Sequence, residues 1–449
     1  MHMISKCALA FAAVSLGACN LDLKNPNSPT EGEVTSSAQA TIGLATGLQG
    51  RYAQSYGNFA YMAGLVTDEF ASTSAALISI SDAEQGIVSP GAGIADNVFN
   101  SIYRTVRTAD ELIAGSDALA DALGVGTRSG LRALAFTLKA ESLGQALQSY
   151  QRIPIRTFGV ATPTYVPRSE SLPYVRALLD SAAAEIAANT PSPLFNSTIL
   201  TPGVNLTNTI NLFRARYARM ANDYPSALAF SNLVARSGPT AMSVLTFPAP
   251  GVNFFNNVTG GTQGIAPRRQ YRTSMEVGDR RFIYFVDTTL TPTGRVQALL
   301  YPFSRYASPQ AALPVYFPDE ALLIKAEALA NTGQLAQAQA VVDSVRTDCT
   351  GNRGIDDPKA CLPALSGTLS QAQLITEIYN QRRFELFATG LRWEDARRRN
   401  LVRGPVAAPG VPLDAQRCWL PYAIGDRNAN PEVPADPPEP TGFPAGCTF

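Results

Sequence analysis

Histidine is almost absent from this chain of 449 residues, and its single example, His2, lies in the leading segment. A body without histidine excludes Ser-His-Asp and Cys-His nucleophilic schemes and lacks the commonest ligand of zinc sites. Phosphate-binding loops of the GxxxxGK type and GxGxxG turns are missing too, which disfavours nucleotide chemistry. A carboxylate pair could still hydrolyse glycosides, but no spacing singles one out among the 36 acidic residues. We expect no catalytic residue, no metal site and no cofactor.

Charge bias and long apolar runs are also missing. The 36 lysines and arginines balance the 36 acidic residues, so the composition does not point to nucleic acid as a partner. After the leading segment no run of 18 uninterrupted apolar residues occurs, so any membrane attachment would depend on a lipid. The hydrophobic fraction of 45% is typical of a globular protein and allows a large core.

The leading segment has the order of a secretory signal. Lys6 precedes a short apolar run at 8–16, and small residues lead into Cys19. The sequence Leu-Gly-Ala-Cys resembles a bacterial lipobox, in which the cysteine thiol receives a diacylglycerol. We expect a lipoprotein signal peptide at 1–18 and a flexible, lipidated tether at 19–35. Ordinary secretion, with an incidental Cys19, is the alternative.

Four cysteines lie beyond the leading segment: Cys349, Cys361, Cys418 and Cys447. An even number in an exported chain indicates disulfides, and four cysteines allow three pairings. The short loop between Cys349 and Cys361 is the pairing we favour, with free buried thiols as the alternative.

Hydrophobic periodicity predicts helices joined by long loops. Residues 318–347 carry two apolar stripes separated by a break at Asn331-Thr332-Gly333, as in a helical hairpin. Residues 209–237 repeat this plan, and the small residues at these spacings resemble a tetratricopeptide unit. Further helices are expected around 36–55, 94–121, 128–150, 170–188 and 371–399, and ordered loops at 149–173, 239–273 and 404–449. The fold class is therefore mainly α.

The segment 378–400 contains charged residues at helical spacing. The pairs three positions apart are Arg382 and Glu385, Arg392 and Asp395, and Asp395 and Arg398. Residues at this spacing are neighbours on a helix, so we expect local ion pairs. Gly390 is expected to end one helix before the next begins. The segment is thus interpreted as a structural helix–turn–helix.

This segment resembles the C-terminal signature of the SusD/RagB family. The matching residues are Arg382, Glu385, Leu386, Gly390, Arg392, Asp395 and Arg398, and the departures are Gln381, Thr389 and Ala396. The lipobox and the segments 65–70, 135–155 and 419–433 are similar to family elements in the same order. The resemblance covers almost all of the chain after Cys19.

The resemblance implies a single SusD-like domain over 36–449, with tetratricopeptide-like hairpins and long inserted loops. It also implies a cell-surface lipoprotein of the outer membrane that captures oligosaccharides or peptides without chemistry. Such proteins deliver their ligand to a SusC-like, TonB-dependent β-barrel transporter. Two alternatives stay open, namely a tetratricopeptide-type envelope scaffold lipoprotein and a carboxylate-dependent glycoside hydrolase.

Ligand contacts are predicted in the loop 247–274. Sugar sites pair aromatic faces with short polar side chains, and this loop offers the candidate residues Phe254, Phe255, Asn256, Asn257 and Tyr271. Adjacent phenylalanines in an extended loop cannot both face one core, so at least one is expected to face solvent or a partner. Asp68, in the segment that resembles the family's early Asp-Glu motif, is the other candidate. A loop that merely packs onto the helices is the alternative.

Overall fold

The computed structural model describes residues 37–72, 78–91, 93–238, 241–247, 249, 251–255, 265–286, 288–289, 303, 305–306, 308–349, 356–403, 415–438 and 447. Cys19, the expected signal peptide and tether, and the candidates Asn256 and Asn257 lie outside these residues. No helix among the described residues is both long and apolar enough to span a bilayer.

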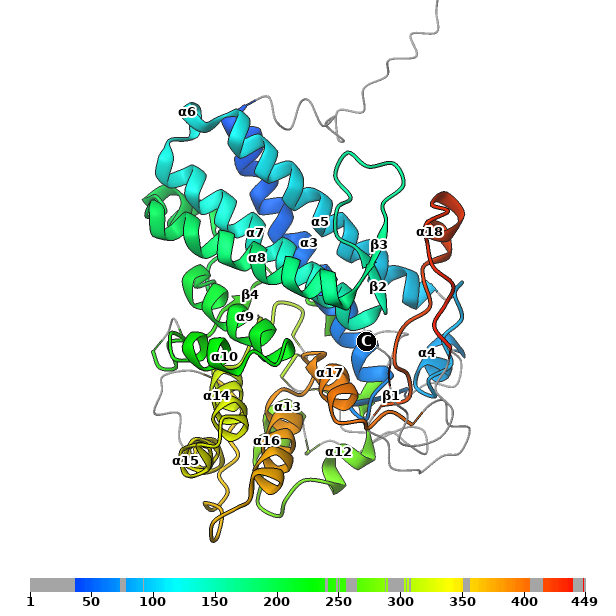
Figure 1. Cartoon of the computed structure of the whole chain (residues 1–449), viewed down its shortest axis with the longest axis vertical. Coiled ribbons are helices and arrows are strands. Elements are labelled where there is room, and N and C mark those ends of the chain that lie inside the picture. Colours follow the sequence, from blue (N-terminus) through cyan, green and yellow to red (C-terminus); the bar gives the residue numbers. More distant parts are fainter. Residues whose placement is uncertain are drawn as a thin grey trace, which may run out of the picture.

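Four long helices form the upper part of the molecule in Figure 1. They are α3 (Ala38–Leu65), α5 (Gly93–Ala118), α7 (Val125–Ser149) and α8 (Arg168–Ala188). Helix α3 packs against α5 and α7, and α7 packs against α8; the short α6 (Ala120–Leu123) joins α5 to α7. The side chains of α7 are buried along almost its whole length, because neighbours cover it on several faces.

The lower part consists of two successive hairpins and a helical corner (Figure 1). The hairpins are α9 (Leu206–Met220) with α10 (Tyr224–Ser231), and α14 (Asp319–Asn331) with α15 (Leu335–Arg346). Helix α10 lies against α14, so the two repeats predicted from the sequence stack on each other. Helices α16 (Gln371–Glu385) and α17 (Leu391–Arg398) form the corner.

Local signals explain where several of these helices begin. Asp223 starts α10 by accepting a hydrogen bond from the Ser226 amide at 3.2 Å. Ser370 and Gln373 form a capping box at the start of α16. Gly390, between α16 and α17, has φ of +81°, and a Cβ there would lie 2.5 Å from the Phe59 ring. Only glycine satisfies both conditions without strain.

Short antiparallel ladders lie between the helices. They are β1 (Phe70–Ser72) with β5 (Ile265–Pro267), β2 (Arg152–Pro154) with β3 (Tyr165–Pro167), and β4 (Val244–Leu245) with β6 (Leu313–Pro314). Short helical pieces complete the described chain: α4 (Ile78–Ala83), η1 (Phe195–Ile199), α12 (Arg269–Thr273), α13 (Arg281–Phe285) and α18 (Ile424–Ala429). The predicted fold class, mainly α with tetratricopeptide-like hairpins and inserted loops, is confirmed.

Two disulfides close loops in the second half of the chain. Cys349 is bonded to Cys361, the pairing that the sequence favours, and Cys418 is bonded to Cys447. The second bond ties residue 447 to the segment that follows α17, whose Trp419 and Leu420 are part of the main hydrophobic core. Each bond restricts the unfolded chain and so stabilises the fold.

Candidate ligand-binding site

Several charged residues of α16 and α17 pair across elements, while Arg397 and Glu394 pair along α17 at 3.1 Å. The Asp395 carboxylate accepts from Arg382 at 2.7 Å and from Arg219 of α9 at 2.8 Å. The Arg398 guanidinium lies 2.9 Å from the Glu327 carboxylate of α14. The expected local pairs of Arg382 with Glu385, of Arg392 with Asp395, and of Asp395 with Arg398 are therefore wrong. In these three cases the charged residue pairs instead with a residue of another element that lies closer than the one three positions away. These buried ion pairs agree with a structural role for the segment 378–400.

Asp68 belongs to the same buried network. Its carboxylate lies 2.9 Å from the Arg392 guanidinium and also pairs with Arg383, and its side chain is almost inaccessible to solvent. Burial alone would raise the pKa of Asp68, but Arg383 and Arg392 outweigh burial and hold that pKa below its usual value. The expectation that Asp68 contacts a ligand is corrected, because its charge fastens the end of α3 to the helical corner.

Phe255 and Tyr271 are buried in an aromatic cluster. The Phe255 ring stacks on Tyr306 with centroids 5.0 Å apart, and the Tyr271 ring stacks on Phe387 at 4.0 Å. The Tyr271 hydroxyl donates to the carbonyl of Phe384 at 3.3 Å. Both side chains are 1% exposed, so the structure leaves them no surface for a ligand. At Phe255 and Tyr271 the loop therefore packs onto the helices, which is the alternative given in the sequence analysis.

Phe254 is less buried than its neighbour Phe255. The rings of Phe254 and Phe255 are nearly perpendicular, and Phe254 is half-buried. The Phe254 ring meets the Tyr61 ring in an edge-to-face contact, with centroids 5.5 Å apart. Asn253 fixes the loop before it, because its side-chain amide donates to the carbonyl of Ser308 at 2.6 Å. A Cβ at Gly57 would overlap Phe254, so the missing side chain of that glycine makes room for the ring. Phe254 is thus the candidate that faces a cavity.

The cavity beside Phe254, termed the Phe254 cavity below, has a volume of about 860 Å³. Its walls come from α3, α7, η1, the start of α9 and the segment 245–254. Three aromatic residues line it, Tyr52, Phe247 and Phe254, together with a set of short polar side chains: Thr46, Gln54, Thr137, Thr198, Thr201, Thr209 and Thr246. This combination suits a molecule that has apolar CH faces and many hydroxyl groups.

Gln49 and Tyr52 form the polar floor of this cavity. The Gln49 side chain donates to the Ile199 carbonyl at 2.9 Å and accepts from the Thr201 amide at 2.8 Å, which holds η1 against α3. The buried Tyr52 hydroxyl has no hydrogen-bond partner among the described residues. Burial raises the pKa of Tyr52 well above its usual value, so the hydroxyl keeps its proton and can donate it. The sequence shows neither residue as special, because both lie within an ordinary helical pattern.

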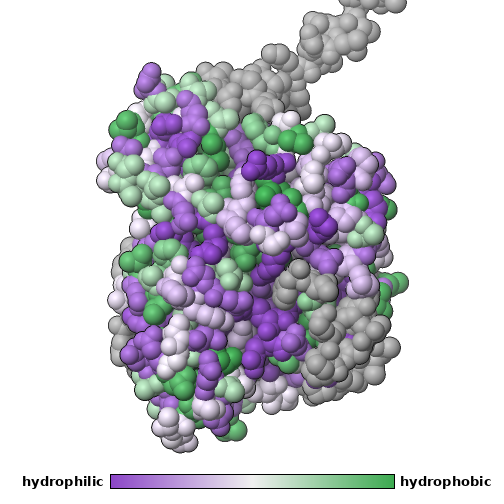
Figure 2. Space-filling view, in the orientation of Figure 1, coloured by the Kyte–Doolittle hydropathy of each residue, from purple (hydrophilic) through white to green (hydrophobic). Residues whose placement is uncertain are grey.

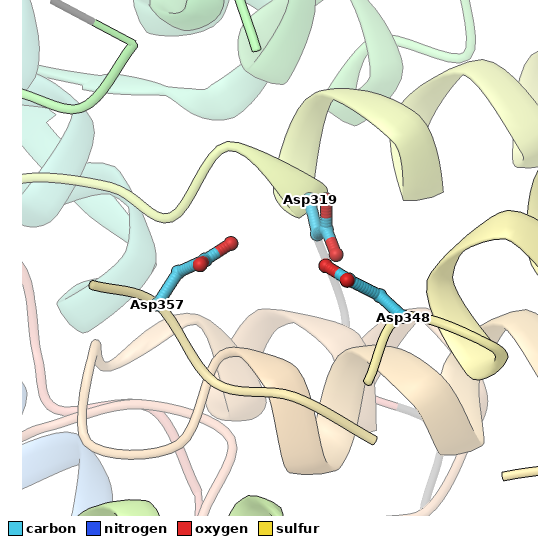
Figure 3. A group of neighbouring side chains, drawn as sticks. All are labelled: Asp319, Asp348 and Asp357. Atoms are coloured by element: carbon cyan, nitrogen blue, oxygen red, sulfur yellow. The ribbon is translucent and has the colours of Figure 1, made fainter. Parts of the chain in front are cut away.

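Three aspartates, Asp319, Asp348 and Asp357, form a cluster outside the Phe254 cavity. The carboxylate oxygens of Asp319, Asp348 and Asp357 lie within 4.8 Å of one another (Figure 3). The Lys359 ammonium donates to Asp348 at 3.0 Å and also to Asp357. Burial alone would lower the pKa of Lys359, but Asp357 and Asp348 outweigh burial and raise that pKa above its usual value, so the ammonium group stays charged. The chain supplies its own cation here, and we assign no metal to the cluster.

Comparisons with known proteins place this fold. The family model for the SusD family matches residues 311–410. A SusD superfamily protein from Bacteroides thetaiotaomicron superimposes with a TM-score of 0.70 at 13% identity, covering 90% of this chain and 100% of that one. A SusD-like carbohydrate binding protein from Bacteroides vulgatus gives 0.68 at 14% identity, covering 88% and 97%. Surface glycan-binding protein A from Bacteroides uniformis gives 0.62 at 14% identity, covering 87% and 98%. No curated protein matches the chain.

These matches define first a class of fold, tetratricopeptide-like helical hairpins with inserted loops. Within that class most of the chain shares the fold of SusD superfamily proteins, and residues 311–410 match the SusD family model. The resemblance to the SusD/RagB family is confirmed.

Proposed function

We propose that this chain is a lipid-anchored protein of the outer cell surface that captures oligosaccharides and delivers them to a SusC-like, TonB-dependent outer-membrane transporter. The anchor would be Cys19, after removal of residues 1–18, and residues 19–35 would be the tether to a single binding domain at 36–449. A peptide is the other ligand class that the sequence leaves open. The observation that carries the proposal is the Phe254 cavity within a SusD-like fold.

Carbohydrate is the ligand that the chemistry of the cavity favours. Phe254 and Phe247 offer apolar faces for sugar rings, while threonine hydroxyls can exchange hydrogen bonds with sugar hydroxyls. Two of the similar structures are described as a carbohydrate binding protein and a glycan-binding protein. That description supports the same ligand class for this chain.

The same walls support binding without turnover. Glycoside hydrolysis needs two carboxyl groups on either side of the scissile bond. Among the described residues that line the Phe254 cavity there is no aspartate or glutamate. The hydrolase alternative therefore has no catalytic pair at this place, and incubation with a glycan panel should release no product.

Calorimetric titration with a panel of neutral oligosaccharides and peptides tests the site. Phe254→Ala should weaken the affinity for the best ligand by about tenfold or more, because a buried aromatic contact is lost. Phe158→Ala removes a solvent-exposed phenylalanine at a different cavity and provides the matched control. Loss of binding in Phe158→Ala, with Phe254→Ala unchanged, would place the site at the other cavity. Tight binding of peptides alone would overturn the choice of ligand.

The transporter partner is tested separately. Solubilised outer membranes that carry the tagged protein should yield a TonB-dependent β-barrel in stoichiometric amount. Recovery of the tagged protein with soluble envelope proteins instead, and without a barrel, would favour the scaffold alternative.

A further inference from the structure

A second cavity, termed the arginine cavity, lies at the other end of α9. Its volume is about 640 Å³, and its walls come from the starts of α8 and α10, the end of α9, and α14, α16 and α17. Leu206 and Thr209 at the start of α9 line the Phe254 cavity, whereas Met220 at its end lines this one. A helix rises 1.5 Å per residue, so about 20 Å separates the two sites. Figure 2 shows hydrophilic residues gathered around α17 in the middle of this face.

Positive charge exceeds negative charge around the cavity. Four arginines line it, Arg168, Arg176, Arg398 and Arg399, with two carboxylates, Glu327 and Glu394. A third carboxylate, Asp223, lies 2.5 Å from the Arg176 guanidinium. Despite burial, the neighbouring arginines lower the pKa of Glu394 to about 2, and they lower the pKa of Glu327 as well. Both carboxylates are thus ionised at neutral pH, and the surplus of arginine is a real positive charge.

The layer behind the cavity does not remove this surplus. Three more arginines pair with the carboxylates there: Arg219 with Glu327, Arg397 with Glu394, and both Arg219 and Arg382 with Asp395. Low-dielectric surroundings weaken the screening of such charges, so the excess is felt at the cavity surface.

Arg399 is the arginine best placed to meet a ligand. Its guanidinium lies over the Tyr379 ring at 5.1 Å and donates to the Thr376 hydroxyl at 3.3 Å. Within the described part of the chain no carboxylate pairs with it, and its side chain is only partly buried. A planar guanidinium held in this way presents its remaining N–H groups to an anion in a fixed orientation.

The remaining walls suit a sugar more than an inorganic ion. Tyr224 and Tyr379 provide aromatic surface, and Ser169, Asn222 and Asn331 provide short polar groups. The Tyr379 hydroxyl accepts hydrogen bonds from Arg219 at 3.0 Å and from Arg398 at 3.2 Å. With its acceptor side occupied, this hydroxyl turns its proton toward a further acceptor.

We propose that the arginine cavity binds an acidic sugar unit, whose carboxylate or sulfate group contacts Arg399. This site is separate from the Phe254 cavity and goes beyond capture of neutral oligosaccharides. A chain with both sites can hold a glycan that carries neutral and acidic units, or discriminate between two glycans.

Calorimetric titration of the whole soluble domain tests the proposal with three probes: trigalacturonate, a sulfated chondroitin disaccharide and neutral maltotriose. At least one acidic probe should bind saturably, with an affinity that falls as salt rises. Arg399→Gln should weaken it about tenfold, since one charge-assisted hydrogen bond is lost. Arg104→Gln, at an exposed arginine of α5, is the matched control and should change nothing.

Both acidic probes carry carboxylates and only the chondroitin disaccharide carries a sulfate, and binding of either one supports the site. No saturable binding, equal binding of maltotriose, or equal loss in Arg104→Gln would overturn it. Stronger Arg399-dependent binding of an acidic peptide would overturn the sugar assignment. Phe254→Ala should leave the acidic probe unaffected, which separates failure here from failure of the proposed function.

Discussion

Arg219 and Asp395 are 176 positions apart in the sequence, yet the guanidinium of one donates to the carboxylate of the other at 2.8 Å. Arg219 also pairs with Glu327, and Asp395 accepts from Arg382 as well. One chain of charges thus connects α9, α14, α16 and α17 in the interior. The two tetratricopeptide-like hairpins and the helical corner are fastened at this point.

Breaking this connection should destabilise the whole domain. Asp395→Asn leaves Arg219 and Arg382 buried without their shared anion, and such a loss costs about 3–5 kcal/mol of the free energy of unfolding. Urea unfolding followed by circular dichroism measures it. Arg107→Gln, which removes a solvent-exposed ion pair with Glu111, should cost at most about 1 kcal/mol.

Acid provides a second check on the same variant. Against the effect of burial, Arg219 and Arg382 lower the pKa of Asp395 to about 2 from its ordinary value of 3.8. The stabilisation is therefore complete above about pH 4 and is lost as the pH falls toward 2. The difference between the parent and Asp395→Asn should shrink in that range. A difference that stays constant would mean that the carboxylate acts through packing and not through charge.

The carboxyl group of Glu69, next to Asp68, should affect stability with a pH dependence opposite to that of Asp395. Burial, helped by the charge of Asp68, raises the pKa of Glu69 to about 8 from 4.5, against the opposing charges of Arg392 and Arg383. Between these values the folded protein holds a proton that the unfolded chain has lost. The free energy of unfolding therefore falls as pH rises from about 4.5 to 8, by at most about 1.4 kcal/mol per pH unit.

Glu69→Gln removes this pH-dependent contribution to the free energy of unfolding. The melting temperature of the variant relative to the parent should therefore rise between pH 5 and pH 8. Thermal unfolding at several pH values measures the trend. Glu170→Gln, at an exposed position of α8, serves as the matched control. A Glu69→Gln difference that is flat across this range would show that the carboxyl is ionised throughout.

The proposed anchor is tested at Cys19. Cys19→Ala should abolish incorporation of a labelled fatty acid and move the protein into a soluble fraction, because a thiol is the acceptor of the lipid. Cys7→Ala, within the segment expected to be the signal peptide, is the matched control and should keep the label. Retention of the label in Cys19→Ala would contradict the lipobox assignment.

Helices and repeats could be predicted because they depend on local order. The stripe of Leu322, Ala326 and Leu329 is buried on α14 as the period of 3.6 residues requires. The same local logic failed for Arg392, because helical spacing shows which residues can meet along one helix but not which helix lies opposite. Its partner, Asp68, is 324 positions away.

The candidate site was only half predictable for a similar reason. The pair Phe254 and Phe255 predicts that one ring leaves the core, but not which one. The orientation of the loop determines which ring leaves the core. The side-chain amide of Asn253 fixes that orientation by donating to the carbonyls of Tyr306, Ser308 and Pro309. Tyr52 and Gln49 carried no signal at all, since their role arises only where η1 folds back onto α3.

The last prediction concerns the close approach of α7 and α9. Gly144 of α7 faces the Tyr217 ring of α9, and a Cβ at Gly144 would overlap the Tyr217 hydroxyl. That hydroxyl donates to Glu141 at 2.6 Å, and Glu141 lies 2.9 Å from the Arg216 guanidinium. Gly144→Ala must push the helices apart or break this buried hydrogen bond, so we expect a loss of about 1–3 kcal/mol.

Gly47→Ala on the exposed face of α3 is the matched control, because no atom lies within 4 Å of its added Cβ. There the substitution should raise stability by about 0.5–1 kcal/mol, through the better helix propensity of alanine. Urea unfolding of both variants gives opposite signs if the helices are in contact at Gly144. Stabilisation of both would show that α7 and α9 are further apart than the hydrogen bond between Tyr217 and Glu141 requires.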